Sequence, residues 1–403
     1  MQSSLNFLQK LSLLLCFVVI FLDLQGLRSF GTTGLIVFGV WLIVTVIAFP
    51  KELRVFISSR RFVWLFVFLL FYFLSSIFVE SLQTSVNRCV AFLRVFSPVI
   101  MYETLRDRSV KLKSILIIFT FAIFLVNIAL SYTFLEVVGA NNLRGVSEDY
   151  GSEFYVVNMV FNMCYAFAIL IPGLIEILRK YRKKEHRKFF LSLLLVALSA
   201  ILLVYLIRAQ FMTAMVLSLV GALVAFFYKG PKSLVSVAVV LAIAAGAFVA
   251  LYPKLSQNID SSKYRDTLYR LDEIYATMTG RGHEASDMNS RQDLTSMSVE
   301  TFFHNPLFGV NHKLTSSMHP NDAGIGNHAE WPDSLARYGL FAILLFMLLW
   351  DSLKRQRQFT GAYFPTFLFI ALGFLNPMWY FPQMFVTFVL LPMIGDIAVK
   401  TKA

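Results

Sequence analysis

Apolar runs recur along the whole chain at lengths that suit membrane crossing. A helix needs about 20 mainly apolar residues to cross the ~30 Å hydrocarbon core of a bilayer. About twelve runs approach that length, and polar or basic stretches separate them. The sequence therefore predicts an all-α polytopic membrane protein with about twelve transmembrane helices. The predicted spans are residues 8–25, 33–49, 62–79, 86–104, 114–134, 154–177, 189–207, 209–228, 233–252, 336–351, 361–378 and 380–398.

One polar stretch is far longer than the connections between the other spans. Residues 253–335, about 80 positions, separate the ninth span from the tenth, whereas bundle helices are usually joined by ~2–8 residues. Apolar residues at helical intervals over 264–278, and a capping pattern that begins at Ser290, predict short helices inside this stretch. The sequence thus divides into 1–252 with the first nine spans, a helical cap loop over 253–335, and 336–403 with the last three.

Lysine and arginine residues are concentrated in alternate connections. In membrane proteins, cytoplasmic connections carry an excess of these residues. With an even number of spans and an N-terminus inside, all the basic clusters fall on the cytoplasmic side, and the cap loop falls on the outer side. The sequence therefore predicts that both termini are cytoplasmic. The clusters lie at residues 51–61, 106–113, 179–188, 229–232, 354–357 and 400–402.

The composition excludes a soluble enzyme. Hydrophobic residues make up 57% of the 403 positions and charged residues only 15%, whereas about 25% charged residues is usual in soluble domains. A net charge of +12 would suggest nucleic-acid binding in a soluble chain. Here membrane orientation accounts for the basic residues, so no nucleic-acid partner is predicted. Cys16, Cys89 and Cys164 lie in apolar runs without a CxxC pattern, which argues against a disulfide framework or a redox motif.

Arg208 stands between two apolar runs of nearly spanning length, at the outer end of a predicted helical hairpin. A charge at bilayer depth costs at least about 2.5–3.5 kcal/mol, so such residues are rarely without a role. One interpretation is a side chain that reaches out to the lipid headgroups. The other is an anion site at the membrane surface, because a guanidinium binds phosphate through paired hydrogen bonds and keeps its proton.

Two further arginines lie in the fourth predicted span. Arg88 is near the outer surface, and Arg94 lies about 9 Å deeper at 1.5 Å per residue. Each is a candidate either for binding a second substrate or for a structural ion pair. Asp23 in the first predicted span is a candidate partner.

His328 precedes the tenth predicted span, in the sequence Gly-Asn-His-Ala-Glu-Trp-Pro-Asp. A lone loop histidine is usually solvated or structural, but an imidazole can also take a proton from a sugar hydroxyl as a general base. Glu330 or Asp333 could orient its ring. No zinc or EF-hand spacing accompanies these residues, so neither a metal site nor a cofactor is predicted.

Three short motifs follow one another in the second half of the chain. They are Ser290-Arg291, then Phe303 with Asn305-Pro306-Leu307-Phe308-Gly309, then His328-Ala329-Glu330-Trp331 with Asp333 and Arg337-Tyr338-Gly339. These motifs resemble those of the O-antigen ligase and polymerase superfamily. Arg208, at the head of a helix before the large loop, resembles an arginine of that superfamily, and the plan of spans is also similar.

The resemblance implies a glycosyltransferase of the bacterial inner membrane with a periplasmic active site and no metal requirement. Its donor would be a glycan on undecaprenyl diphosphate. By motif, Arg208 and Arg291 would bind the diphosphate, and His328 would activate the acceptor hydroxyl. The partners would be the lipid-linked glycan and membrane lipid, and a chain-length regulator is a further candidate.

Departures from the ligase pattern favour a polymerase. That pattern has Asn, Ser or Gln after the histidine and a second glycine three residues beyond the first, where this chain has Ala329 and Ala342. We therefore expect an O-antigen polymerase that joins lipid-linked repeat units by inverting transfer. The alternative is an O-antigen ligase that moves finished polymer onto lipid A–core. A flippase or transporter is a lesser alternative, because transporters place ionisable groups at the midplane and here they concentrate at the outer end.

Overall fold

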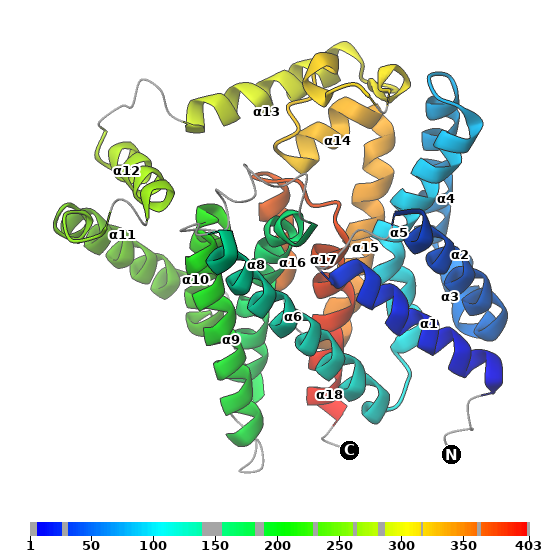
Figure 1. Ribbon diagram of the computed structural model, residues 1–403, viewed down its shortest axis with the longest axis horizontal. Coiled ribbons are helices and arrows are strands. Elements are labelled where there is room, and N and C mark those ends of the chain that lie inside the picture. Colours follow the sequence, from blue (N-terminus) through cyan, green and yellow to red (C-terminus); the bar gives the residue numbers. More distant parts are fainter. Residues whose placement is uncertain are drawn as a thin grey trace.

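The computed structural model is helical, and no strand occurs among the residues it describes (Figure 1). These residues are 6–25, 31–138, 155–181, 189–228, 233–260, 264–280, 287–315, 317–360 and 364–400. The predicted class of helical membrane protein is therefore confirmed. The helices of the first half are α1 (Phe7–Leu24), α2 (Gly31–Ala48), α3 (Pro50–Ile57), α4 (Arg60–Ile77), α5 (Leu82–Leu105), α6 (Val110–Val138), α8 (Tyr155–Tyr181), α9 (Phe189–Ala209) and α10 (Met212–Phe227).

The second half begins with a long apolar helix and then enters the cap loop. Its last part returns to the bundle and includes one π-helical segment, η6. The elements are α11 (Leu234–Ser256), α12 (Arg265–Thr279), α13 (Asp287–His304), η3 (Asn311–Lys313), η4 (Pro320–Ala323), α14 (Glu330–Tyr338), η5 (Gly339–Phe341), α15 (Ala342–Thr360), α16 (Phe364–Gly373), α17 (Phe381–Phe385), η6 (Val386–Leu390) and α18 (Leu391–Lys400).

Among the described residues, 7 helices are long and apolar enough to cross a membrane. Shorter apolar helices follow at Leu193–Ala209, Met212–Phe227 and Phe381–Ile397. Each predicted span overlaps a helix or consecutive helical segments, although α16 covers only Phe364–Gly373 of the span 361–378. The protein is thus membrane-embedded, while the number of crossings and the side on which the cap loop lies stay predictions.

Some helix boundaries differ from those predicted. The predicted capping pattern at Ser290 is wrong, because α13 already begins at Asp287 and Ser290 lies inside it. Gly339, with φ +58°, separates α14 from α15 where one continuous span was predicted. α16 ends at Gly373, earlier than predicted, because the nearby Pro377 disfavours helical geometry in the residue before it.

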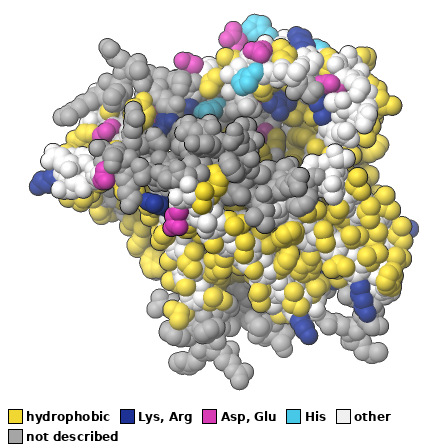
Figure 2. Space-filling view, viewed as in Figure 1, with side chains coloured by type: hydrophobic (Ala, Val, Ile, Leu, Met, Phe, Trp, Pro, Cys, Tyr) yellow, Lys and Arg dark blue, Asp and Glu magenta, His cyan; other side chains and the backbone are white. Residues whose placement is uncertain are grey.

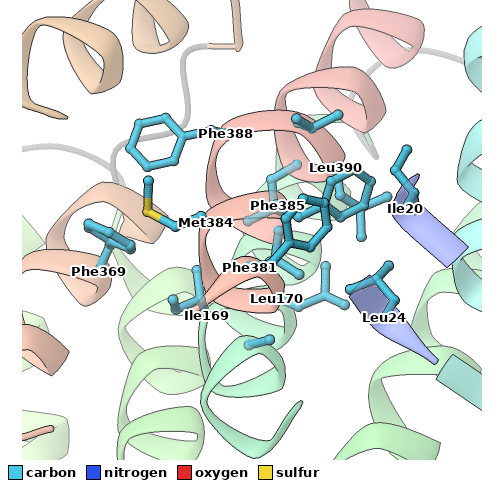
Figure 3. Packing of buried hydrophobic residues seen from close by; sticks show 14 of the residues in the cluster. Ile20, Leu24, Ile169, Leu170, Phe369, Phe381, Met384, Phe385, Phe388 and Leu390 are labelled. Atoms are coloured by element: carbon cyan, nitrogen blue, oxygen red, sulfur yellow. The ribbon is translucent and has the colours of Figure 1, made fainter. Parts of the chain in front are cut away.

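The core is centred on α8. Over Val160–Arg179, 83% of this helix is buried, and the side chains from Cys164 to Leu170 are all buried in succession. A helix that is apolar on every side belongs inside a bundle. It packs against α9, α10, α16, α17 and η6. Figure 3 shows this packing, with Leu170 of α8 near Leu24 of α1 and Ile169 on the side of Met384 of α17 and Phe369 of α16.

One end of the bundle contains an ion-pair cluster around Glu103 of α5. This carboxylate, with a side chain only 1% exposed, lies 2.8 Å from Arg61, 3.0 Å from Arg355 and 3.3 Å from Arg106. A buried carboxylate needs such partners to stay charged. Members of three basic clusters that were predicted to share one side of the membrane therefore meet at the same end of the bundle.

The cap loop lies toward the other end. Figure 1 shows α13 and α14 at the top, whereas α1 begins and α18 ends at the bottom. In Figure 2, hydrophobic side chains form a broad belt on the lower part of the same face, and acidic and histidine side chains gather above it. Such a belt is what a lipid-facing surface requires, because hydrocarbon cannot solvate charges.

Candidate functional site

The loop that carries His328 is held by the first turn of α14. Oδ2 of Asp333 accepts the backbone N–H of His328 at 2.6 Å and that of Ala329 at 2.9 Å. Ala329 is the N-cap residue of α14, so these bonds satisfy amides that the helix itself leaves unpaired. A carboxylate is also favoured at a helix N-terminus by the helix dipole. His328 therefore stands on a fixed backbone, with its side chain half-buried.

The other oxygen of the same carboxylate connects this loop to α13. Oγ of Ser298 donates to Oδ1 of Asp333 at 2.5 Å and accepts the backbone N–H of Gly326 at 2.8 Å. A Cβ on Gly326 would lie only 2.1 Å from the carbonyl oxygen of Leu294, so only glycine permits this approach. The middle of α13 and the His328 loop thus lie in direct backbone contact.

The contact between α13 and the His328 loop also determines where Arg291 lies. It stands on α13 one turn before Leu294, whose carbonyl touches the His328 loop, and its side chain is half-buried. Three residues of helix amount to about 4.5 Å along the axis. The structure therefore brings Arg291 and His328, which are 37 positions apart in sequence, to the same part of the molecule.

Glu330 joins α14 to the connection between α16 and α17. Its Oε2 accepts the backbone N–H groups of Met378 at 2.7 Å and Trp379 at 3.1 Å, and its Oε1 accepts the hydroxyl of Ser334 at 2.9 Å. Both oxygens of this buried carboxyl group thus have hydrogen-bond donors, as buried polar groups require. The bonds of Glu330 and of Asp333 thus go to the main chain and to serine hydroxyls. Orientation of the His328 ring by either carboxylate stays a prediction.

Arg208 lies in the last turn of α9, half-buried and electrostatically close to Tyr132 of α6. Within the described part of the chain its guanidinium makes neither a hydrogen bond nor an ion pair. The turn that follows is tight, with Gln210 at φ +58°. Oγ1 of Thr267 in α12 donates to Oε1 of Gln210 at 3.0 Å, so the α9–α10 turn contacts the cap loop.

Arg94 has the partner that the sequence suggested. Its Nη2 lies 2.6 Å from Oδ1 of Asp23 in α1, so of the two arginines of α5 it is Arg94 that pairs with the candidate partner. Gly34 of α2 lies against the guanidinium, since a Cβ there would be 2.8 Å from Nη1 of Arg94. The side chain thus ties α5 to α1 and α2, and this contact supports the structural alternative for Arg94.

Arg88 connects the N-terminal part of α5 to the cap loop. Its Nη2 lies 3.1 Å from Oε1 of Glu80, and its Nη1 donates to the carbonyl oxygen of Leu314 at 3.2 Å. The guanidinium also lies within electrostatic range of the Tyr72 hydroxyl of α4. Arg88 is therefore placed where α4, α5 and the cap loop meet.

Arg337 belongs to one of the motifs quoted from the sequence, but the sequence analysis gave it no role. Its Nε is buried and has no hydrogen-bond partner among the described residues, and Glu330, Tyr338 and Tyr72 are its electrostatic neighbours. An unpaired buried polar atom is uncommon and requires an explanation. The signal in the sequence was spacing: Glu330, Ser334 and Arg337 follow the i, i+4, i+7 pattern of one helix face.

The segment Asn305–Gly309 packs on the C-terminal end of α14. The backbone N–H of Val310 donates to Ala336 at 3.0 Å, and that of Leu340 donates to Pro306 at 2.8 Å. Gly309 has φ +59°, and a Cβ there would lie 2.4 Å from the carbonyl carbon of Arg337. Two motifs that are about 30 residues apart thus form one backbone unit.

Together these contacts define a helical membrane protein with a polar site between its cap loop and one end of its bundle. Among the described residues, no group of three or more His, Cys, Asp or Glu side chains could hold a metal ion. No protein-family model matches the chain, and a comparison with curated proteins finds no match. The function must therefore be argued from the residues themselves.

Proposed function

We propose that this protein is a glycosyltransferase of the bacterial inner membrane that polymerises oligosaccharide repeat units carried on undecaprenyl diphosphate. The resemblance of its motifs to O-antigen polymerases and ligases suggests the substrate class. The observation that carries the proposal is the Ser298–Asp333–His328 connection, which places a candidate general base next to the helix that bears Arg291. A candidate base on a loop that contacts the helix of a cation suits a transfer that both deprotonates an acceptor and releases an anion.

The donor diphosphate binds between Arg291 on α13 and Arg208 at the tip of α9. As the anomeric carbon–oxygen bond breaks, negative charge develops on the diphosphate. Guanidinium groups stabilise that charge through paired hydrogen bonds, which is usually a large contribution to catalysis. The leaving group is undecaprenyl diphosphate, which stays in the membrane.

The acceptor is the terminal sugar of a second lipid-linked chain. Its hydroxyl oxygen attacks the anomeric carbon from the side opposite the diphosphate, so the configuration inverts. His328 takes the hydroxyl proton as the new carbon–oxygen bond forms. One glycosidic bond is formed, the bond between the anomeric carbon and the diphosphate oxygen is broken, and no metal takes part.

The surface glycan of a deletion strain tests this proposal. A missing polymerase leaves single repeat units attached to lipid A–core, and this is the expected result. Bare core with polymer stranded on the lipid carrier would instead identify a ligase. Repeat units trapped inside the cell would identify a flippase, and unchanged long chains would refute the proposal altogether.

A further inference from the structure

A groove with a volume of about 690 Å³ runs along the cap-side half of α4. One wall is α4 itself, and the other is built from the cap loop and η5. Such a volume lies within the usual range for a ligand site, about 300–1,000 Å³. The groove is lined by Val67, Leu70, Phe71, Leu74, Ser75, Phe78, Phe308, His312 and Phe341.

The α4 wall of the groove is an exposed apolar stripe. Val67, Leu70 and Leu74 recur at helical spacing on one face, and Leu70 and Leu74 are each 48% exposed. From residue 67 to residue 78 the stripe covers about 16 Å along the helix axis. The groove therefore runs parallel to a helix that is long and apolar enough to cross the membrane, which is also the direction of lipid chains.

The opposite wall is held in place by stacked rings. Phe71 and Phe341 lie face to face with ring centroids 3.9 Å apart, and Phe308 follows at 6.4 Å from Phe71. Stacking of this kind adds to the free energy of burial and fixes ring orientation. The groove is thus preformed rather than a gap between mobile side chains.

Among the lining residues, polar and basic groups occur only at the cap end of the groove. His312 and Ser75 line this end, and Nδ2 of Asn311 donates to Oγ of Ser75 at 2.6 Å. Lys313, next to His312 in η3, is exposed. An apolar trough with a basic rim is complementary to a lipid that has a hydrocarbon chain and an anionic headgroup.

The groove lies next to the C-terminal end of α14, the helix whose first turn holds the His328 loop. Phe308 precedes Gly309, which packs on Arg337, and Phe341 follows Gly339. The groove thus ends at the C-terminal end of α14, while His328 precedes the N-terminal end. The helix between them covers about 12 Å. A substrate whose lipid end and reacting hydroxyl are separated by a diphosphate and sugars needs a separation of this kind.

We propose that the groove binds the polyprenyl chain of the second lipid-linked substrate, the acceptor, and that its diphosphate contacts the His312–Lys313 rim. This inference rests on the proposed polymerase function. The chain enters sideways from the membrane, and the sugars extend along α14 toward His328. The donor diphosphate, at Arg208 and Arg291, is thereby kept apart from that of the acceptor.

Photo-crosslinking identifies the occupant directly. A photoreactive amino acid replaces Leu74, and a matched control replaces Val63, which is 53% exposed on the same face of α4 but lies outside the groove. The full chain is placed in nanodiscs of phosphatidylethanolamine and phosphatidylglycerol that contain undecaprenyl diphosphate. We expect undecaprenyl diphosphate to be enriched over phospholipid about tenfold more at Leu74 than at Val63, equivalent to about 1.4 kcal/mol. The same lipid ratio at both positions would identify ordinary boundary lipid and overturn the proposal.

A steric variant gives an independent measurement. Leu74→Trp fills the groove at an exposed position, so we expect the KM for the lipid-linked acceptor to rise about tenfold with little change in kcat. Val63→Trp should change neither, and equal KM values in the two variants would contradict the inference. If undecaprenyl diphosphate is enriched at Leu74 but the deletion strain still makes long glycan chains, the groove is supported and the polymerase function is refuted. Shortened chains with equal lipid ratios would support the function and refute the groove.

Discussion

The backbone N–H of His328 donates a 2.6 Å hydrogen bond to Oδ2 of Asp333, and Oδ1 of the same carboxylate accepts the hydroxyl of Ser298. One buried side chain therefore joins the loop that carries the candidate base to α13, which carries Arg291. The carboxylate acts on this loop through the main chain, so the position of the candidate base depends on backbone hydrogen bonds.

Asp333→Asn should weaken this connection, because the neutral amide offers one acceptor oxygen in place of two charged ones and cannot accept both the N–H groups of His328 and Ala329 and the hydroxyl of Ser298 on separate oxygens. Hydrogen bonds to a charged group contribute about 1.5–3 kcal/mol, so we expect a loss of about 2 kcal/mol in the free energy of unfolding and a lower rate of glycan transfer. Thermal denaturation and a transfer assay measure the two effects. Glu300→Gln on the exposed face of α13 is the control and should change neither. An Asn variant as active as the wild type would contradict a positioning role for Asp333.

His328→Ala should abolish glycan transfer while the protein stays inserted and keeps its melting temperature. A general base contributes about 10²–10⁴-fold in rate, so we expect the transfer rate of His328→Ala to be lower than that of the wild type by a factor in this range or larger. His304→Ala, at an exposed position of α13, is the matched control. Activity retained in His328→Ala would show that the reaction does not need this imidazole as a proton acceptor, and would refute the general-base role.

Arg208→Lys keeps the positive charge but loses the planar pair of donors. We expect a fall of about thirtyfold in kcat/KM, which corresponds to about 2 kcal/mol, the strength of a hydrogen bond to a charged group. Arg60→Lys, exposed near the start of α4, serves as the control for the same chemical change. If the Arg208→Lys variant kept the wild-type turnover, Arg208 would be a contact to lipid headgroups rather than to the leaving diphosphate.

Glu103→Ala should destabilise the end of the bundle where three arginines meet. Removing one partner of a buried ion pair costs about 3–5 kcal/mol, because Arg61 would keep its charge without a buried counterion. The melting temperature in detergent measures this loss. Asp107→Asn is the comparison, because the Asp107 side chain, which pairs with Arg106, is 62% exposed. Equal melting temperatures for the two variants would show that the cluster is not a stabilising contact.

Gly309→Ala should separate the Asn305–Gly309 segment from α14. Its φ of +59° disfavours a side chain, and the added Cβ would overlap the Arg337 carbonyl. Strain of this type costs about 1–3 kcal/mol before the steric overlap is counted. Gly246→Ala in α11 meets nothing within 4 Å and should be neutral or stabilising. Similar melting temperatures and transfer rates for both variants would show that this backbone contact is dispensable.

Several features of the fold could be predicted because they depend on local sequence. Each apolar run of spanning length forms a helix, since hydrocarbon leaves a backbone no other way to satisfy its hydrogen bonds within one segment. Asp23 was a candidate partner for Arg88 or Arg94, because opposite charges inside predicted spans compensate each other, but only the structure selects Arg94. The start of α13 was not predictable, since a capping pattern at Ser290 does not exclude a helix that begins one turn earlier.

The sequence alone determined the helical membrane class, the chemistry available at each position and the candidates His328, Arg208 and Arg291. Hydropathy and charge act on each segment separately, so they can be evaluated without knowing its neighbours. Only the tertiary structure decided that Asp333 and Glu330 bond to main-chain amides, that the Nε of Arg337 is buried with Glu330 as an electrostatic neighbour, and that a groove follows α4. These features depend on which segments come into contact across long sequence separations. That choice follows from side-chain packing and backbone approach at particular glycines, which no local pattern encodes.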